Sequence, residues 1–203
     1  MLNTQYMTRL LAGAACLVSV AAYAHPAEDL VKTTTQDVLT ILKRDNKPGN
    51  EKLVRDQVTA KLLPYFDFTR MTALVVGKNW RSATPAQQAS LTKEFKTLMI
   101  QTYSNVLTST KVDNITVKPV QDPDTSTDVM VKTVVNRSGA AAIPVDYHMA
   151  SNGSTWKVYD VIAEGRSIVT AQRSSYSQVV TQSGIDGLIK ELASKNQQPQ
   201  AKP

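Results

Sequence analysis

The stretch spanning residues 155–176 constrains the fold most, because it joins a strand pattern directly to the start of a helix. Residues 156–163 alternate with the period of a half-buried strand. The two predicted sides are Trp156, Val158, Asp160 and Ile162 on one, and Lys157, Tyr159, Val161 and Ala163 on the other. Both sides carry bulky apolar groups. We therefore expect each face to be covered, or one face to border an apolar cavity.

The residues around this strand define its ends. Asn152-Gly153 is a hairpin signal, because this pair tolerates the positive φ of a tight reverse turn. Gly165 is expected to end the strand, and Ser167 is placed to cap a following helix. The stretch is thus predicted to be the last strand of a sheet, turning into a helix that packs back on it.

The N-terminal residues 1–24 have the composition of a secretory signal peptide. Residues 1–9 contain one basic residue and no acid, residues 10–22 are nearly all apolar or small, and Ala24 precedes the expected cleavage site. A membrane anchor is disfavoured because the apolar run is too short to span a bilayer. A lipoprotein cleaved at Cys16 is disfavoured because Gly13 stands where leucine is usual. The mature chain is expected to begin at His25.

Cysteine usage and charge limit the chemistry of the mature chain. The only cysteine of the full sequence, Cys16, lies in the predicted signal peptide, so disulfides, thiol nucleophiles and thiolate metal sites are excluded from the mature chain. Lys and Arg outnumber Asp and Glu by 23 to 17, which suits an anionic partner or simply a basic surface. Basic runs interleaved with aromatics are absent from the sequence, so nucleic acid is not an expected partner. We predict one domain over 25–195 and a disordered tail over 196–203.

The first half of the mature chain has helical periodicity. Asn50, Asp67 and Thr84 are predicted N-caps, Gln87 completes a capping box with Thr84, and Gly77 is a predicted helix terminator. The predicted helices span residues 27–44, 51–63, 67–76 and 84–107.

The second half changes to strand periodicity. Four strands are predicted, over 112–120, 129–136, 143–150 and 156–163, with short turns that imply an antiparallel meander. Gly184 and Gly187 are expected to interrupt the C-terminal helices. Helices followed by strands make an α+β domain, with the helices packed on one face of a mostly antiparallel four-stranded sheet.

Catalytic signals are sparse. Asp146 and His148 share one face of a predicted strand and are the one acid–base pair the sequence suggests. The sequence has no glycine-rich phosphate loop, zinc-ligand spacing or nucleophile elbow. We therefore expect a binding protein without metal or cofactor. The alternative is an enzyme on a similar fold that acts on a hydrophobic substrate through Asp146 and His148.

The mature chain carries, in order, Pro64-Tyr65-Phe66-Asp67-Phe68, then Gly77 with Trp80, and finally Trp156 to Val161 with Glu164-Gly165 and Ser167. These motifs resemble the MlaC family of periplasmic phospholipid-binding proteins, also known as toluene-tolerance proteins. The strand–helix block is the most specific part, and the Asp-Phe helix comes second. In Ala171-Gln172-Arg173 the arginine of the family's Tyr-Arg pair is kept and the aromatic is not. The residues that carry the resemblance are Pro64-Tyr65-Phe66-Asp67-Phe68, Gly77, Trp80, Phe95, Tyr103, Tyr147, Trp156 to Val161, Glu164-Gly165 and Ser167.

The resemblance implies a cone similar to nuclear transport factor 2, with additional helices. It implies a soluble periplasmic monomer without catalytic activity. Such a protein carries phospholipid between an outer-membrane lipoprotein–porin complex and an inner-membrane ABC transporter, and so maintains outer-membrane lipid asymmetry. The acyl chains would lie in a cavity between sheet and helices.

The resemblance also suggests site residues. Arg166 and Arg173, near the strand–helix junction, are candidates to neutralise the lipid head group, and would otherwise be exposed solvated arginines. The candidates for the tail cavity are Val75, Leu98, Met99, Val145, Tyr147, Val161 and Ile168. The same apolar residues would also serve as ordinary core, in which case the protein would be a periplasmic adaptor that binds no lipid.

Overall fold

The computed structural model describes residues 24–109, 111–123, 125–153 and 155–198; the predicted signal peptide, apart from Ala24, lies outside the described residues. The helical half and the sheet half follow each other along the chain, as predicted. The helices are α1 (Pro26–Asp45), α2 (Glu51–Leu62), α3 (Phe68–Val76), α4 (Pro85–Ser109) and α5 (Ile168–Gln197), with short 3-10 helices η1 (Leu63–Tyr65) and η2 (Gly77–Ser82). The strands are β1 (Val112–Val117), β2 (Asp128–Arg137), β3 (Ala140–Ser151), β4 (Trp156–Ala163) and β5 (Arg166–Ser167).

The strands form one antiparallel sheet in the order β1-β2-β3-β4-β5. The predicted α+β class and antiparallel meander are confirmed, but the predicted number of four strands is wrong. Glu164 and Gly165 have φ angles of 51° and 78°, which form a tight two-residue turn. This turn folds the chain back, so that Ser167 pairs with Ile162 before α5 begins.

A β-bulge in β4 changes which side chains share a face. His148 of β3 pairs with Asp160, but the next residue, Met149, pairs with Val158, which leaves Tyr159 as the extra residue. The prediction that Val158 and Val161 face opposite sides is therefore wrong. The bulge shifts the alternation by one position, and both valines face the same side of the sheet as Met149.

The predicted helix caps are confirmed at three sites. The Oδ1 atom of Asp67 accepts a hydrogen bond from the Arg70 N–H at 2.8 Å, and Ser167 Oγ accepts one from the Thr170 N–H at 3.0 Å. Thr84 and Gln87 form the reciprocal capping box: the Gln87 N–H donates to Thr84 Oγ1 at 3.3 Å, and the Thr84 N–H donates to Gln87 Oε1 at 3.0 Å. Asn50 also occupies a cap position, but there the prediction is wrong, since no side-chain cap bond forms.

The C-terminal helix is longer and less interrupted than predicted. Gly184, with φ 71° and ψ −177°, kinks α5, whereas Gly187 lies within its second helical segment. Asn196, where the tail was expected to begin, is part of α5, and its Nδ2 donates to the backbone carbonyl and the carboxylate of Glu94 in α4, at 3.0 and 2.8 Å.

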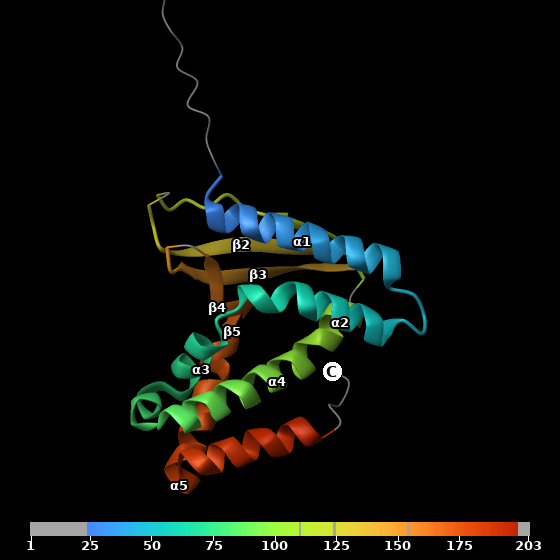
Figure 1. Ribbon diagram of the computed structural model, residues 1–203. Coiled ribbons are helices and arrows are strands. Elements are labelled where there is room, and N and C mark those ends of the chain that lie inside the picture. The colour runs from blue at the N-terminus through green and yellow to red at the C-terminus, as the bar shows by residue number, and fades with distance from the viewer. Residues whose placement is uncertain (1–23, 110, 124, 154, 199–203) are drawn as a thin grey trace, which may run out of the picture.

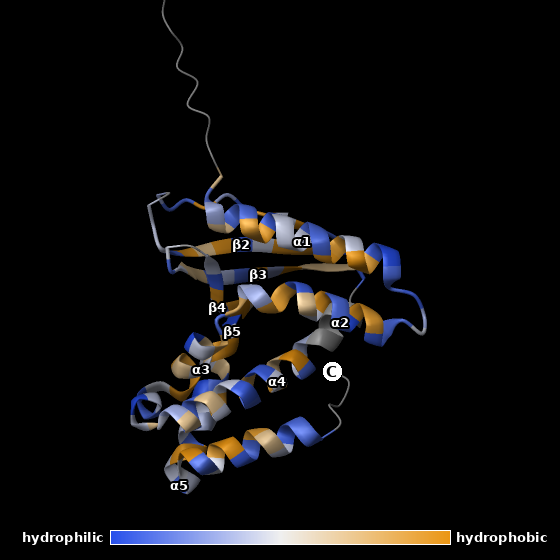
Figure 2. Ribbon diagram, in the orientation of Figure 1, coloured by the Kyte–Doolittle hydropathy of each residue, from blue (hydrophilic) through white to orange (hydrophobic). Residues whose placement is uncertain are grey.

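The helices form two groups around the sheet. Figure 1 shows α1 lying along the sheet with α2 beside it, while α4 and α5 run next to each other at the other end of the molecule. The helices carry separate hydrophobic and hydrophilic stripes (Figure 2), and α4 and α5 bury theirs against each other through residues such as Phe95 and Leu188. This core of α3, α4 and α5 is distinct from a second core, in which Val31 of α1 packs against Val131 of the sheet.

Glu28 fastens α1 to the sheet half of the molecule. Its buried carboxylate accepts a hydrogen bond from the Val120 N–H at 2.9 Å and pairs with Lys32 at 2.5 Å. Burial alone would raise the pKa of Glu28, but the bonds from Lys32 and Val120 outweigh it and hold the pKa below its usual 4.5.

Because the folded-state pKa of Glu28 is depressed, its stabilising contribution is present above pH 4.5 and is lost as the pH falls through the folded value. We expect Glu28→Gln to have a lower free energy of unfolding than the wild type at pH 7. At pH 3 the free energies of unfolding of the two proteins should differ less than at pH 7. Urea denaturation at the two pH values measures both. Equal differences at pH 7 and pH 3 would contradict this role.

Candidate functional site

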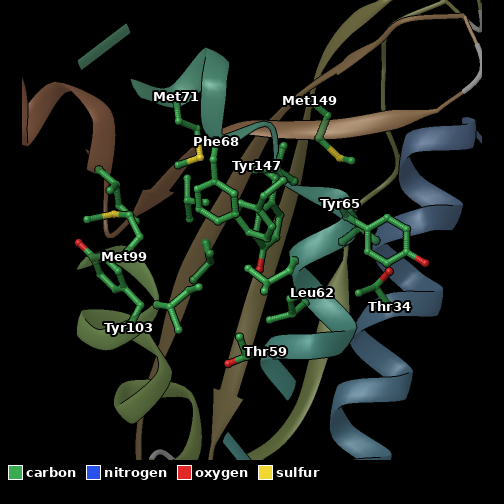
Figure 3. Close-up of a pocket in the computed structure, with 18 of the residues that line it drawn as sticks. Thr34, Thr59, Leu62, Tyr65, Phe68, Met71, Met99, Tyr103, Tyr147 and Met149 are labelled. Atoms are coloured by element: carbon green, nitrogen blue, oxygen red, sulfur yellow. The ribbon is translucent and has the colours of Figure 1, made fainter. Parts of the chain in front are cut away.

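A cavity of about 290 Å³ lies between the sheet and the helices. Its walls come from α1, α2, η1, α3, α4, β3, β4 and the first residue of α5. It lies between the two cores, since Met71 and Met99 of the first core and Met149 of the second all line it. Figure 3 shows these methionines around the same space, with Phe68 between them.

The bulge in β4 completes the sheet wall of the cavity. Val158 and Val161 both line it, next to Tyr147 and Met149 of β3. Without the bulge, simple alternation would turn one of the two valines to the opposite face. This local irregularity therefore makes the sheet wall continuous and apolar.

The cavity lining is apolar and uncharged. Its polar groups are hydroxyls, from Thr34, Thr35 and Thr59 and from the tyrosines Tyr65, Tyr103 and Tyr147. Burial raises the pKa of Tyr103 and of Tyr147 above the usual value of 10, so both phenols stay neutral at physiological pH. The lining can shield hydrocarbon and donate neutral hydrogen bonds, but it offers no charged group to a proton-transfer reaction.

The structure brings five of the seven predicted tail-cavity residues together. Met99, Val145, Tyr147, Val161 and Ile168 line the cavity. Val75 does not, because it is fully buried in the core of α3, α4 and α5. Leu98 packs against that same core from α4.

Neither arginine predicted for the head group lines the cavity. Arg166 is exposed on β5. Arg173 is exposed on α5, and its guanidinium lies against Gly77. A side chain at Gly77 would crowd that guanidinium, because an added Cβ would stand 3.2 Å from Arg173 Nε. The strand–helix junction borders the cavity through Ala163 and Ile168, but the two arginine side chains are not part of its lining.

Asp160 holds the strand–helix junction together. Its buried carboxylate accepts hydrogen bonds from the Ser167 hydroxyl at 2.6 Å, the Val161 N–H at 2.8 Å and the Val169 N–H at 3.2 Å. These bonds tie β4 to the first turn of α5. They fix Val161 and Ile168, two residues of the cavity wall on either side of the turn.

Asp146 and His148 lie on the other face of the sheet from the cavity. The cavity residues of β3 are Val145, Tyr147 and Met149, so the residues between them point away. His148 packs edge-on against Tyr159, with the ring centroids 5.7 Å apart. Asp146 pairs across the sheet with Lys132 and Ile162. The two side chains do not border the same cavity as the apolar lining.

Sequence reasoning missed the α1, α2 and α3 contributions to the wall. Leu30, Thr34, Thr59, Leu62 and Phe68 all line the cavity. Leu30 and Leu62 recur at helical spacing in the first two predicted helices, and this periodicity alone does not show that they face a cavity. The threonines were missed because their signal, a hydroxyl at helical spacing beside an apolar stripe, is weak.

Comparison with known proteins identifies the family. The family model described as MlaC protein matches residues 32–194 of the chain. The chain belongs to the MlaC family. The match begins within α1 and ends within α5, so it includes at least part of every element that lines the cavity. The predicted resemblance to the MlaC or toluene-tolerance family is confirmed.

Two curated relatives agree with the assignment to the MlaC family. The chain is 29% identical over 190 residues to the toluene tolerance protein ttg2D of Pseudomonas putida, covering 89% of this chain and 87% of that protein. It is 24% identical over 149 residues to the intermembrane phospholipid transport system binding protein MlaC of Haemophilus influenzae, covering 72% of this chain and 70% of the relative.

A solved structure shares both the fold and part of the sequence. The phospholipid-binding protein from Ralstonia solanacearum, determined in complex with a phospholipid, superposes with a TM-score of 0.75. It is 29% identical in sequence, and the match covers 86% of this chain and 97% of the solved one.

Among residues 24–109, 111–123, 125–153 and 155–198, no helix is long and apolar enough to cross a membrane.

Proposed function

We propose that this protein is a soluble periplasmic carrier that holds the acyl chains of a phospholipid in the cavity between sheet and helices. The observation that carries the proposal is the uncharged, apolar lining of that cavity. Support comes from the similarity to the phospholipid-binding protein from Ralstonia solanacearum, which was solved in complex with a phospholipid. An adaptor that binds no lipid would have side chains filling this space, whereas the structure has a cavity of about 290 Å³ there.

The energetics of acyl chains explain why such a carrier is needed. Each methylene removed from water stabilises the bound state by about 0.8 kcal/mol, so two long chains do not cross an aqueous compartment unaided at a useful rate. A protein that encloses them removes most of this barrier. We propose that the lipid passes between an outer-membrane lipoprotein–porin complex and an inner-membrane ABC transporter, in keeping with the name of the Haemophilus influenzae relative.

The carrier needs no chemical step. The cavity lining offers hydroxyls but no charged acid or base, and Asp146 and His148 lie on the opposite face of the sheet. We therefore propose a binding and release cycle without catalysis. The enzyme alternative has no observation in its favour among the described residues.

One experiment tests the cargo and the export of the protein together. We expect the full chain, expressed with its N-terminal region and purified from the periplasmic fraction without detergent, to begin at His25. We also expect native mass spectrometry to detect it with bound phospholipid. The mass of the denatured protein gives the first residue, and collisional release identifies the lipid. A chain that remains lipid-free after exposure to phospholipid vesicles would contradict the proposal.

A further inference from the structure

Lys96 of α4 lies next to the cavity, although it is not one of the lining residues. Residues three and four apart on a helix share a face, which places Lys96 in one row with Met99, Ile100 and Tyr103. All three of those residues line the cavity. Lys96 therefore stands one helical turn before the α4 wall, at the edge of the apolar surface.

A second contact places Lys96 at the same edge. Its Nζ atom lies 5.7 Å from the ring centroid of Phe68 in α3, within the range of a cation–π interaction. Phe68 itself lines the cavity, and Figure 3 shows its ring pointing into the same space as Met99 and Tyr103. Lys96 is half-buried, so its aliphatic stem covers apolar surface while its ammonium group stays at the boundary.

The charge of Lys96 is not neutralised by a carboxylate in the part of the chain that the structure describes. Other lysines nearby differ in this respect. Lys61 of α2 pairs with Asp37 of α1 at 2.6 Å, and Lys93 of α4 lies 3.8 Å from Glu94. A half-buried ammonium carries three hydrogen-bond donors and favours an anionic partner when no carboxylate is present.

We propose that Lys96 binds the phosphate of the lipid head group while the acyl chains occupy the cavity beyond Phe68. This inference rests on the proposed function, because the anion it names belongs to the cargo. Lys96, like Arg166 and Arg173, is not itself a lining residue, but it lies in the helical row that leads to Met99 and Ile100 and contacts Phe68, which do line the cavity. Phe68 then has two roles, as a wall for hydrocarbon and as a platform that holds the ammonium at the boundary.

The test compares Lys96→Gln with Lys93→Gln, because each removes one positive charge from α4. The Lys93 side chain is 79% exposed, whereas Lys96 is half-buried and lies over the ring of Phe68. Delipidated proteins are incubated with vesicles containing phosphatidylglycerol or a diacylglycerol with the same acyl chains, and the bound lipid is counted by native mass spectrometry. We expect Lys96→Gln to lower phosphatidylglycerol uptake about tenfold, as loss of one charge-assisted bond predicts. Diacylglycerol uptake should be unchanged, and Lys96→Arg should retain phosphatidylglycerol.

The outcomes separate this inference from the proposed function. Wild-type protein that takes up neither lipid contradicts both. Wild-type protein that takes up phosphatidylglycerol, with equal uptake by the Lys96→Gln and Lys93→Gln variants, overturns the role of Lys96 alone.

A second measurement adds inorganic phosphate to the lipid-free proteins. If it raises the melting temperature of the lipid-free wild type but not of Lys96→Gln, Lys96 binds free phosphate and the head-group assignment is wrong. Equal, unchanged melting temperatures support it.

Discussion

Replacing Val161 with tryptophan should abolish phospholipid binding and leave the lipid-free protein nearly as stable as the wild type. Val161 lines a cavity of about 290 Å³, and the indole would occupy space that an acyl chain needs. Since that space is not filled by other side chains, the larger residue is accommodated with little rearrangement. Lipid content from native mass spectrometry and thermal unfolding of delipidated samples measure the two effects. Delipidation is essential, because bound lipid itself raises the melting temperature.

Val75→Trp is the matched control for this substitution. Val75 is fully buried in the core of α3, α4 and α5 and does not line the cavity. Overpacking a dense core costs about 1–3 kcal/mol or more, so this variant should lose stability before it loses lipid. A Val161→Trp protein that unfolds as early as Val75→Trp, yet still co-purifies with normal amounts of lipid, would show that Val161 is core.

Asp160→Ala should lower the free energy of unfolding by about 3 kcal/mol, because it leaves buried N–H donors without an acceptor. The carboxylate accepts three hydrogen bonds at the β4–α5 junction, including one from the Val169 N–H, which is itself buried. Chemical denaturation of the lipid-free protein measures the loss. The wall residue Ile168, which follows the cap Ser167, should become more mobile, and this is visible as faster amide exchange at the start of α5.

Asp146→Ala serves as the control for the loss of a carboxylate. Asp146 lies on β3 opposite Ile162 and is not one of the residues bonded at the junction, so its removal should change stability by no more than about 0.5 kcal/mol. If the Asp160 and Asp146 variants lose the same stability, the hydrogen bonds to Asp160 do not hold the junction together.

Local signals in the sequence predicted most helices and strands, and the differences between the predicted and the observed elements come from non-local pairing and backbone conformation. The caps at Asp67, Thr84 and Ser167 depend on residues within three positions, and all three form as predicted. The bulge at Tyr159 depends on how β4 pairs with β3, which no period along one strand encodes. The extra strand β5 follows from positive φ at Glu164 as well as at Gly165, and glutamate gives no warning of that conformation.

The site was predictable where it lies on the sheet and less so where it lies on the helices. Val145, Tyr147 and Val161 were found because alternation places them on a strand face, although the face of Val158 was assigned wrongly. An apolar helix stripe, in contrast, does not distinguish a residue packed against a neighbour from one that faces a void. Val75 and Met99 lie on such stripes, and only their three-dimensional surroundings separate core from cavity.

The placement of the cavity between two separate cores gives the cargo a structural role. Met71 and Met99 border it from the helical core, and Val31 and Met149 border it from the core of α1 and the sheet. An acyl chain in this position makes contacts with both and completes one continuous interior. Loading would then increase the cooperativity of unfolding, and the empty carrier would be the form most open to periplasmic proteases.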